Sequence, residues 1–149
     1  MRSPRSLALV AAAAGALLWA VPATAANPDV ELGLGADWLV SPQDGAFQLT
    51  LGGDKRINAN LSWGGRIGLL VLTDPTRLGV PIDVRLRGHF GRMYVEGLVG
   101  PWLVFDDSDT VRFHGAVGFG LVMRGFTVGL EVGYLDPTSM VGLRLALPL

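Results

Sequence analysis

Apolar and polar residues alternate along most of this chain, and this period of two constrains the fold more than any other feature. Such alternation puts every second side chain on the same face of a β-strand. Eight segments follow the pattern, at residues 31–38, 46–51, 57–71, 82–90, 93–105, 111–121, 126–134 and 141–147. After residue 25 no sustained 3.6-residue pattern appears, and the 21 glycines disfavour helices. The sequence therefore predicts an all-β protein.

The first 25 residues have the three parts of a cleaved secretory signal. Arg2 and Arg5 precede an apolar run over residues 7–21, and Ala23-Thr24-Ala25 supplies small residues for signal peptidase. The run is shorter than the roughly 20 residues that a membrane-spanning helix needs. We expect a signal peptide at 1–25 and one β-barrel domain at 26–149. The chain has no cysteine, so this domain is held together without disulfides and carries no lipid anchor.

The connections between the eight segments alternate in character. Tight glycine turns are expected at residues 52–55, 91–92 and 124–125. Pro, Asp and Ser, which favour loops, are common at residues 41–44, 73–81, 106–109 and 136–139. Transmembrane barrels have an even number of strands, short periplasmic turns and longer external loops. With a periplasmic N-terminus, the tight turns fall on the periplasmic side.

The two faces of the strands differ in chemistry. In segment 82–90, Ile82, Val84 and Leu86 alternate with Asp83, Arg85 and Arg87. Segment 93–105 is ambiguous: if Glu96 lies with the other charges, Tyr94, Leu98 and Trp102 share its face. Overall, the face opposite the bulky apolar residues carries few large apolar groups. It carries small residues and ten charged ones: Glu31, Asp37, Arg66, Asp83, Arg85, Arg87, Glu96, Arg112, Glu131 and Arg144.

An eight-stranded barrel has an interior just wide enough for side chains to fill. Five acidic and five basic side chains can neutralise one another in such an interior, which leaves the apolar face for lipid. Aromatic residues of the apolar face lie near strand ends, as in the aromatic girdles of membrane barrels. Trp38, Phe47, Phe105, Phe113 and Tyr134 lie toward the Pro/Asp loops, and Phe90 and Phe126 lie by the tight turns. The alternative is a soluble barrel in which the same aromatic residues cap an apolar core.

This pattern resembles the small bacterial outer-membrane β-barrel families of the outer-membrane protein A and X type. The resemblance covers the whole of residues 26–149 and rests on strand pattern rather than on one motif. It implies an eight-stranded antiparallel up-and-down transmembrane barrel that the outer-membrane assembly machinery inserts. The last residues, Leu147-Pro148-Leu149, depart from the aromatic residue with which such families usually end.

Candidates for chemistry are few. His89 and His114 have no paired spacing with further metal ligands, so we interpret both as polar filler of the interior. Residues 106–109 lack the spacing of a calcium loop and are interpreted as a solvated turn. A triad of Ser108, His114 and a nearby aspartate is disfavoured, since His114 points inward and Ser108 lies in a loop. No basic run indicates nucleic-acid binding.

The sequence thus predicts a non-enzymatic outer-membrane barrel with a structural or surface-binding role and no cofactor. Its expected partners are outer-membrane lipid and the assembly machinery, and we expect a monomer. Two alternatives remain open at this point. One is a soluble periplasmic barrel that binds a small apolar ligand, and the other is a lipid-modifying outer-membrane enzyme.

Overall fold

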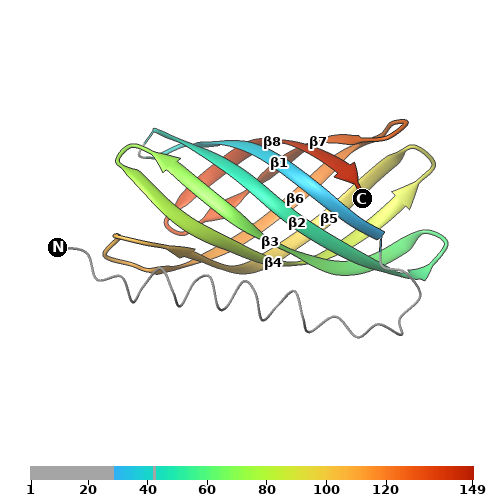
Figure 1. The fold of residues 1–149 in the computed structure, drawn as a ribbon, viewed down its shortest axis with the longest axis horizontal. Helices are drawn as coiled ribbons and strands as arrows, with labels where there is room; N and C mark the ends of the chain where they lie inside the picture. Colours follow the sequence, from blue (N-terminus) through green and yellow to red (C-terminus); the bar gives the residue numbers. More distant parts are fainter. Residues whose placement is uncertain (1–28, 42) are drawn as a thin grey trace.

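Eight antiparallel strands close into one barrel in the computed structural model, which describes residues 29–41 and 43–149 (Figure 1). The strands are β1 (Asp29–Leu39), β2 (Asp44–Asn58), β3 (Leu61–Thr73), β4 (Thr76–Phe90), β5 (Met93–Val104), β6 (Val111–Val122), β7 (Thr127–Leu135) and β8 (Thr138–Pro148). Each strand pairs with the next in sequence, and β8 pairs with β1 from Glu31↔Pro148 to Leu39↔Met140. The predicted up-and-down barrel is confirmed, while the expected signal peptide lies outside the described residues. No helix within the described residues is long and apolar enough to cross a bilayer.

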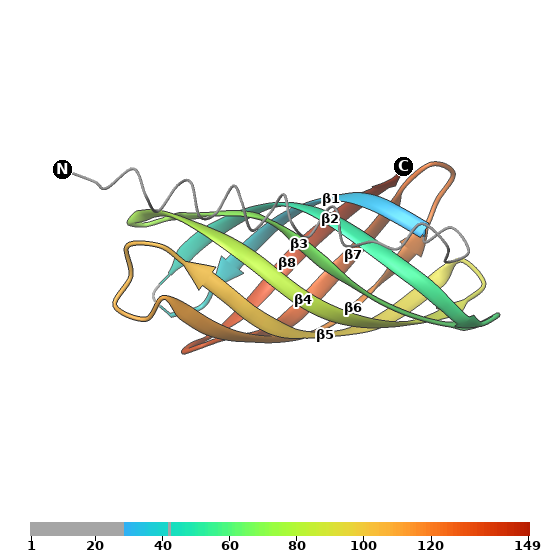
Figure 2. The same cartoon turned by 60° about the horizontal axis from the view of Figure 1, so that its bottom comes forward.

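The strands are strongly inclined to the long axis of the barrel, and the connections between them lie at its two ends (Figures 1 and 2). The end that carries the β1–β2, β3–β4, β5–β6 and β7–β8 connections is called the loop end here. The opposite end, called the terminal end, carries the start of β1, the end of β8 and the other three connections. Gly91 and Gly125 have φ values of 64° and 83° in terminal-end turns, a region that glycine enters without steric cost.

The turn predicted at residues 52–55 is wrong, because β2 continues to Asn58 and turns at Ala59 and Asn60. Asn58 makes this turn itself: its side-chain Oδ1 accepts a hydrogen bond from the backbone N–H of Asn60 at 2.9 Å. Residues 57–60 therefore belong to β2 and its turn rather than to the third strand. Asp54, which a turn would have exposed, is consequently a buried residue of the barrel wall.

The long loop predicted at residues 73–81 is also wrong. Asp74 and Pro75 alone connect β3 to β4, and Pro81 lies within β4. Proline has no N–H to donate, and the β3–β4 ladder skips the pairs between Ile67↔Ile82 and Leu70↔Gly79. The ladder resumes in the same register on both sides of this gap, so the strand tolerates Pro81 without a bulge.

The connection predicted at 136–139 is shorter than expected as well, since Thr138 already opens β8 and is buried. Its Oγ1 accepts a hydrogen bond from the backbone N–H of Ser41 at 2.9 Å. Two of the four loop-end connections are thus two-residue turns, at Asp74–Pro75 and Asp136–Pro137. The longest connection is β5–β6, over residues 105–110. Loop length therefore distinguishes the two ends much less clearly than the sequence predicted.

The interior is layered rather than polar throughout, which corrects the expectation of few large apolar groups inside. A cluster of buried apolar side chains fills the interior at the loop end and is called the apolar plug here: Leu39, Ala46, Leu70, Leu72, Trp102, Val104, Leu135 and Met140. Most of its members lie within a few residues of the loop-end termini of β1, β2, β3, β5, β7 and β8. From the plug to the terminal end the interior holds mainly charged and polar side chains, together with Tyr94 and Leu98.

Candidate functional site

Five buried side chains and the half-buried Arg144 form a network halfway along the interior, called the central cluster here: Asp37, Arg66, Asp83, His114, Glu131 and Arg144. Arg66 donates its Nε to Asp83 at 2.8 Å and its two terminal nitrogens to Glu131 at 2.9 and 3.0 Å. Arg144 contacts the same Glu131 through Nε and Nη2 at 3.0 and 2.9 Å. One carboxylate therefore holds two guanidinium groups from different strands. Paired and hydrogen-bonded in this way, the charges avoid most of the cost of burial.

His114 completes the central cluster and joins it to the apolar plug. Its Nδ1 lies 2.6 Å from Asp83 and its Nε2 lies 3.4 Å from Glu131. The ring also packs against Trp102, with the two centroids 4.4 Å apart. Trp102 donates its indole N–H to Asp83 at 3.1 Å. The stacked rings of Trp102 and His114 thus form the boundary between the plug and the cluster. A ring nitrogen of each contacts Asp83.

A second network, called the terminal cluster here, lies nearer the terminal end: Glu31, Asp54, Arg85, Arg87 and Glu96. Arg85 pairs with Glu31 and, through Nη2, with Asp54 at 2.8 Å. Arg87 donates Nε to Glu96 at 2.8 Å and Nη2 to Glu31 at 3.2 Å. The guanidinium of Arg87 also lies 4.7 Å from the centre of the Tyr94 ring, a cation–π contact.

A third, smaller group closes the loop end. Asp107, in the β5–β6 connection, accepts from Arg112 and pairs with Arg77 at 2.8 Å. Burial disfavours the charged carboxylate, but the hydrogen bond and charge of Arg112, the Ser108 backbone N–H and the charge of Arg77 together hold the pKa of Asp107 below its usual value. At the neighbouring β3–β4 turn, Asp44 accepts from the backbone N–H of Thr73 at 3.1 Å and from its hydroxyl at 2.8 Å. These contacts hold the β5–β6 connection and the β3–β4 turn against the barrel wall.

Interior glycines make room for the long charged side chains. A Cβ on Gly35 would lie 2.7 Å from Nη1 of Arg144, and one on Gly118 would lie 2.9 Å from Cγ of Glu96. These glycines face the space that the guanidinium and carboxylate groups occupy. A Cβ would meet a charged side chain in the same way at Gly52, Gly64 and Gly142, so part of the glycine content makes room for the buried charges.

The structure places all ten charged residues singled out from the sequence in the interior, but in different groups. Nine belong to the central and terminal clusters, whereas Arg112 joins Asp107 at the loop end. Sequence reasoning missed Asp54, Arg77 and Asp107. All three fall in segments predicted as turns or loops, where the apolar/polar alternation was not used to assign a face. For segment 93–105, Tyr94, Leu98 and Trp102 lie inside with Glu96.

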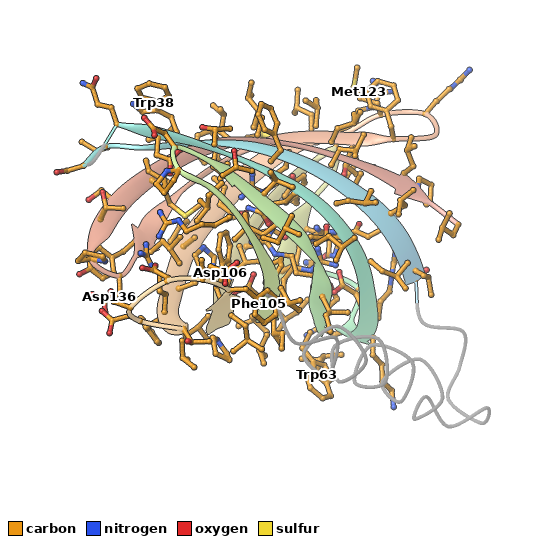
Figure 3. All side chains as sticks on the ribbon, turned by 60° about the vertical axis from the view of Figure 1, so that its left-hand side comes forward. Trp38, Trp63, Phe105, Asp106, Met123 and Asp136 are labelled. Atoms are coloured by element: carbon orange, nitrogen blue, oxygen red, sulfur yellow. The ribbon has the colours of Figure 1, made fainter. Side chains whose placement is uncertain are left out.

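Apart from the apolar plug, Tyr94 and Leu98, bulky apolar side chains on every strand point away from the barrel. Leu69, Val84 and Leu143, for example, are 60%, 58% and 59% exposed. Among the aromatic residues singled out, Trp38, Phe47, Phe113 and Tyr134 are exposed toward the loop end, and Phe90 and Phe126 toward the terminal end. Phe105 is half-buried in the β5–β6 connection. Trp63, which the sequence analysis did not include in this set, joins the terminal-end aromatics, and Trp38 and Trp63 both point away from the wall (Figure 3).

The candidate catalytic and metal-binding groups are not brought together. His114 faces Asp83 and Glu131, whereas the backbone N–H of Ser108 donates to Asp107 at 2.8 Å in an exposed loop. His89 Nε2 instead lies 3.1 Å from Oγ of the buried Ser62. Over residues 29–41 and 43–149, no three His, Cys, Asp or Glu side chains are arranged to hold a metal ion.

The exposed charges are separated between the two ends. In the part of the chain that the structure describes, the exposed basic residues all lie at the terminal end: Lys55, Arg56, Arg92 and Arg124. The loop end instead exposes Asp74, Asp106, Asp109 and Asp136. Asp29, which pairs with Arg56 at 3.5 Å, is the exposed acidic residue of the terminal end. The barrel therefore has a basic rim and an acidic rim.

Comparison with known proteins supports the fold and does not extend to a family. No family model and no curated protein matches the chain. Two de novo designed transmembrane β-barrels superpose with TM-scores of 0.65 and 0.61, at 10% and 12% identity. They cover 83% and 85% of this chain and 98% of each design. The Yersinia pestis outer membrane protein Ail, solved in a phospholipid bilayer nanodisc, superposes with a TM-score of 0.55 at 11% identity, over 83% of this chain and all of Ail. The chain thus resembles small transmembrane barrels in fold.

Proposed function

We propose that this protein is an integral outer-membrane β-barrel with a structural role and no enzymatic activity. The observation that carries the proposal is the inverted polarity of the barrel: ion pairs fill much of the interior while bulky apolar side chains cover the outside. A closed barrel satisfies its backbone hydrogen bonds internally, so it can lie in lipid. An exposed apolar belt around a whole barrel far exceeds the few hundred Å² that soluble monomers tolerate.

The same observation weighs against a soluble barrel that binds an apolar ligand. Such a protein needs an apolar cavity inside and a polar surface outside. Here the apolar plug packs the interior near the loop end, and charged groups hold the space on either side of it. A ligand in that space would have to displace side chains such as Arg66 or Glu131, whose ion pairs neutralise each other.

The packed interior also supports a barrel that does not conduct solutes. Trp102, Leu70, Leu72 and Met140 are fully buried across the loop-end half of the interior. Eight-stranded barrels have interiors that side chains can fill. We expect no steady ion conductance from the folded protein in a planar bilayer.

The partners that fit this role are outer-membrane lipid around the belt and the outer-membrane assembly machinery during insertion, with no nucleic acid. The closed sheet has no free edge strand through which copies could pair, which favours a monomer. With the terminal end in the periplasm, the short acidic loop end faces outward. Among the described residues, the exposed aspartates at that end offer a charged surface for a surface-binding role.

The test uses the mature chain, residues 26–149, produced unfolded and then diluted into buffer alone or into lipid vesicles. We expect the chain to fold only when vesicles are present and to sediment with them. The folded form should migrate as a compact band on a gel, and heating the sample should abolish that band. In the native host, the protein should fractionate with the outer membrane. A folded monomer in lipid-free buffer would overturn the proposal.

A further inference from the structure

A recess of about 580 Å³ opens at the terminal end, where the β4–β5 and β6–β7 connections meet. Arg92, Val122, Met123, Arg124 and Phe126 line it. The β4–β5 connection is joined to the end of β6, since the backbone N–H of Val122 donates to the carbonyl of Arg92 at 2.7 Å. A second bond, from the N–H of Met123 to the carbonyl of Phe126 at 2.8 Å, shapes the β6–β7 turn.

The lining of the recess is amphipathic. Val122, Met123 and Phe126 are 38%, 47% and 36% exposed, which leaves apolar surface at the level where the barrel belt ends. Arg92 and Arg124 are both exposed, and neither forms an ion pair with a carboxylate of the described residues. Arg56, at the same end of the barrel, differs because it pairs with Asp29. The recess therefore combines two exposed basic side chains that have no acidic partner among the described residues with three apolar side chains.

We propose that this recess binds the phosphate headgroup of an anionic glycerophospholipid, with Arg92 and Arg124 on the phosphate and the start of an acyl chain against Phe126. Arginine forms bidentate hydrogen bonds to phosphate oxygens, and its aliphatic stem lies readily along an apolar surface. The turns of a membrane barrel lie at headgroup depth, so a lipid reaches the recess without leaving its leaflet. This proposal rests on the membrane residence proposed above.

The occupant is a lipid rather than a free anion for two reasons. The recess is half apolar, and an inorganic phosphate would leave Val122, Met123 and Phe126 uncovered. An anionic leaflet also raises the local concentration of negative headgroups at a basic surface, with an effect that decays within a Debye length. The acidic loop end would repel the same headgroups, so the two rims together favour one orientation of the barrel.

The test measures retained lipid by native mass spectrometry of the protein folded in a neutral detergent. Phosphatidylglycerol and phosphatidylcholine are offered at equal concentration. We expect the wild type to retain phosphatidylglycerol in preference. The double variant Arg92→Gln/Arg124→Gln should lose that preference, by about fivefold for each arginine removed. Adding inorganic phosphate should leave the bound phosphatidylglycerol in place.

The matched control is Lys55→Gln/Arg56→Gln, which removes two positive charges from the same rim away from the recess. This control should keep the preference for phosphatidylglycerol. Equal losses in the two double variants, no preference in the wild type, or displacement by inorganic phosphate would each overturn the proposal. A wild type that folds without detergent or lipid would instead overturn membrane residence itself. Folding is measured separately, because the folded barrel migrates as a compact band on a gel when the sample is not heated.

Discussion

Arg66 on β3 and Glu131 on β7 meet through two hydrogen bonds of 2.9 and 3.0 Å across the interior of the barrel. Four strand positions separate β3 from β7 in a sheet of eight, so this ion pair joins opposite walls. Both side chains are almost completely buried. The pair therefore connects two opposite strands of the barrel through the interior.

The first prediction is that Glu131→Ala destabilises the barrel by about 3–5 kcal/mol, because it leaves Arg66 and Arg144 buried without their shared carboxylate. Denaturant unfolding of the protein in lipid vesicles measures the free energy. Asp109→Asn, at an exposed loop position, is the control and should change stability by less than about 0.5 kcal/mol. Similar values for the two variants would mean that the central cluster does not stabilise the fold.

A second prediction compares two glycines of β5. A Cβ on Gly100 would lie 1.9 Å from the backbone oxygen of Ile82, whereas one on Gly97 would meet no atom within 4 Å. Gly100→Ala should therefore cost about 1–3 kcal/mol, since backbone must move. Gly97→Ala should be neutral or stabilising by up to about 1 kcal/mol, because it reduces the freedom of the unfolded chain. Unfolding midpoints of the two variants, measured side by side, decide the matter, and a reversed order would contradict this packing.

The third prediction separates the two roles of Trp102. Trp102→Ala empties the centre of the apolar plug and should cost about 3–5 kcal/mol. Trp102→Phe keeps an aromatic ring but loses the hydrogen bond to Asp83, and should cost about 1 kcal/mol, because Arg66 and His114 still contact that carboxylate. The fluorescence of Trp38 and Trp63 remains available to follow unfolding. Equal losses in the two variants would show that the hydrogen bond, not the packing, is what matters there.

The face of the strand on which each residue lies could be predicted from the sequence, because one face of every strand is bulky and apolar. That rule puts Arg85 and Glu131 on the interior side, where the structure has them. The strand ends could not be predicted in the same way. Gly52-Gly53 and Pro81 normally favour turns, but here the strands continue through them, because glycine fits beside Arg85 and Glu31 and proline costs only a gap in one ladder.

Pair partners were also beyond sequence reasoning. The alternation predicts that Arg66 points inward, but it does not predict that Glu131, on the opposite wall, is its partner. The apolar plug was missed for a related reason, since Leu70 and Leu72 lie in a long apolar run where both faces are apolar. In such a run the period of two disappears, and the polarity of the interior cannot be read from it.

The most direct test of membrane residence is the cost of an outward-facing charge at two depths. Leu130, near the middle of β7, and Val111, at the loop-end start of β6, both point away from the barrel. In lipid, Leu130→Arg should cost roughly 2–4 kcal/mol and Val111→Arg at most about 1 kcal/mol, because the penalty falls from the bilayer midplane to the interface. Unfolding free energies in vesicles provide the comparison. If Leu130→Arg costs no more than Val111→Arg, the outer face of this barrel does not lie in a bilayer.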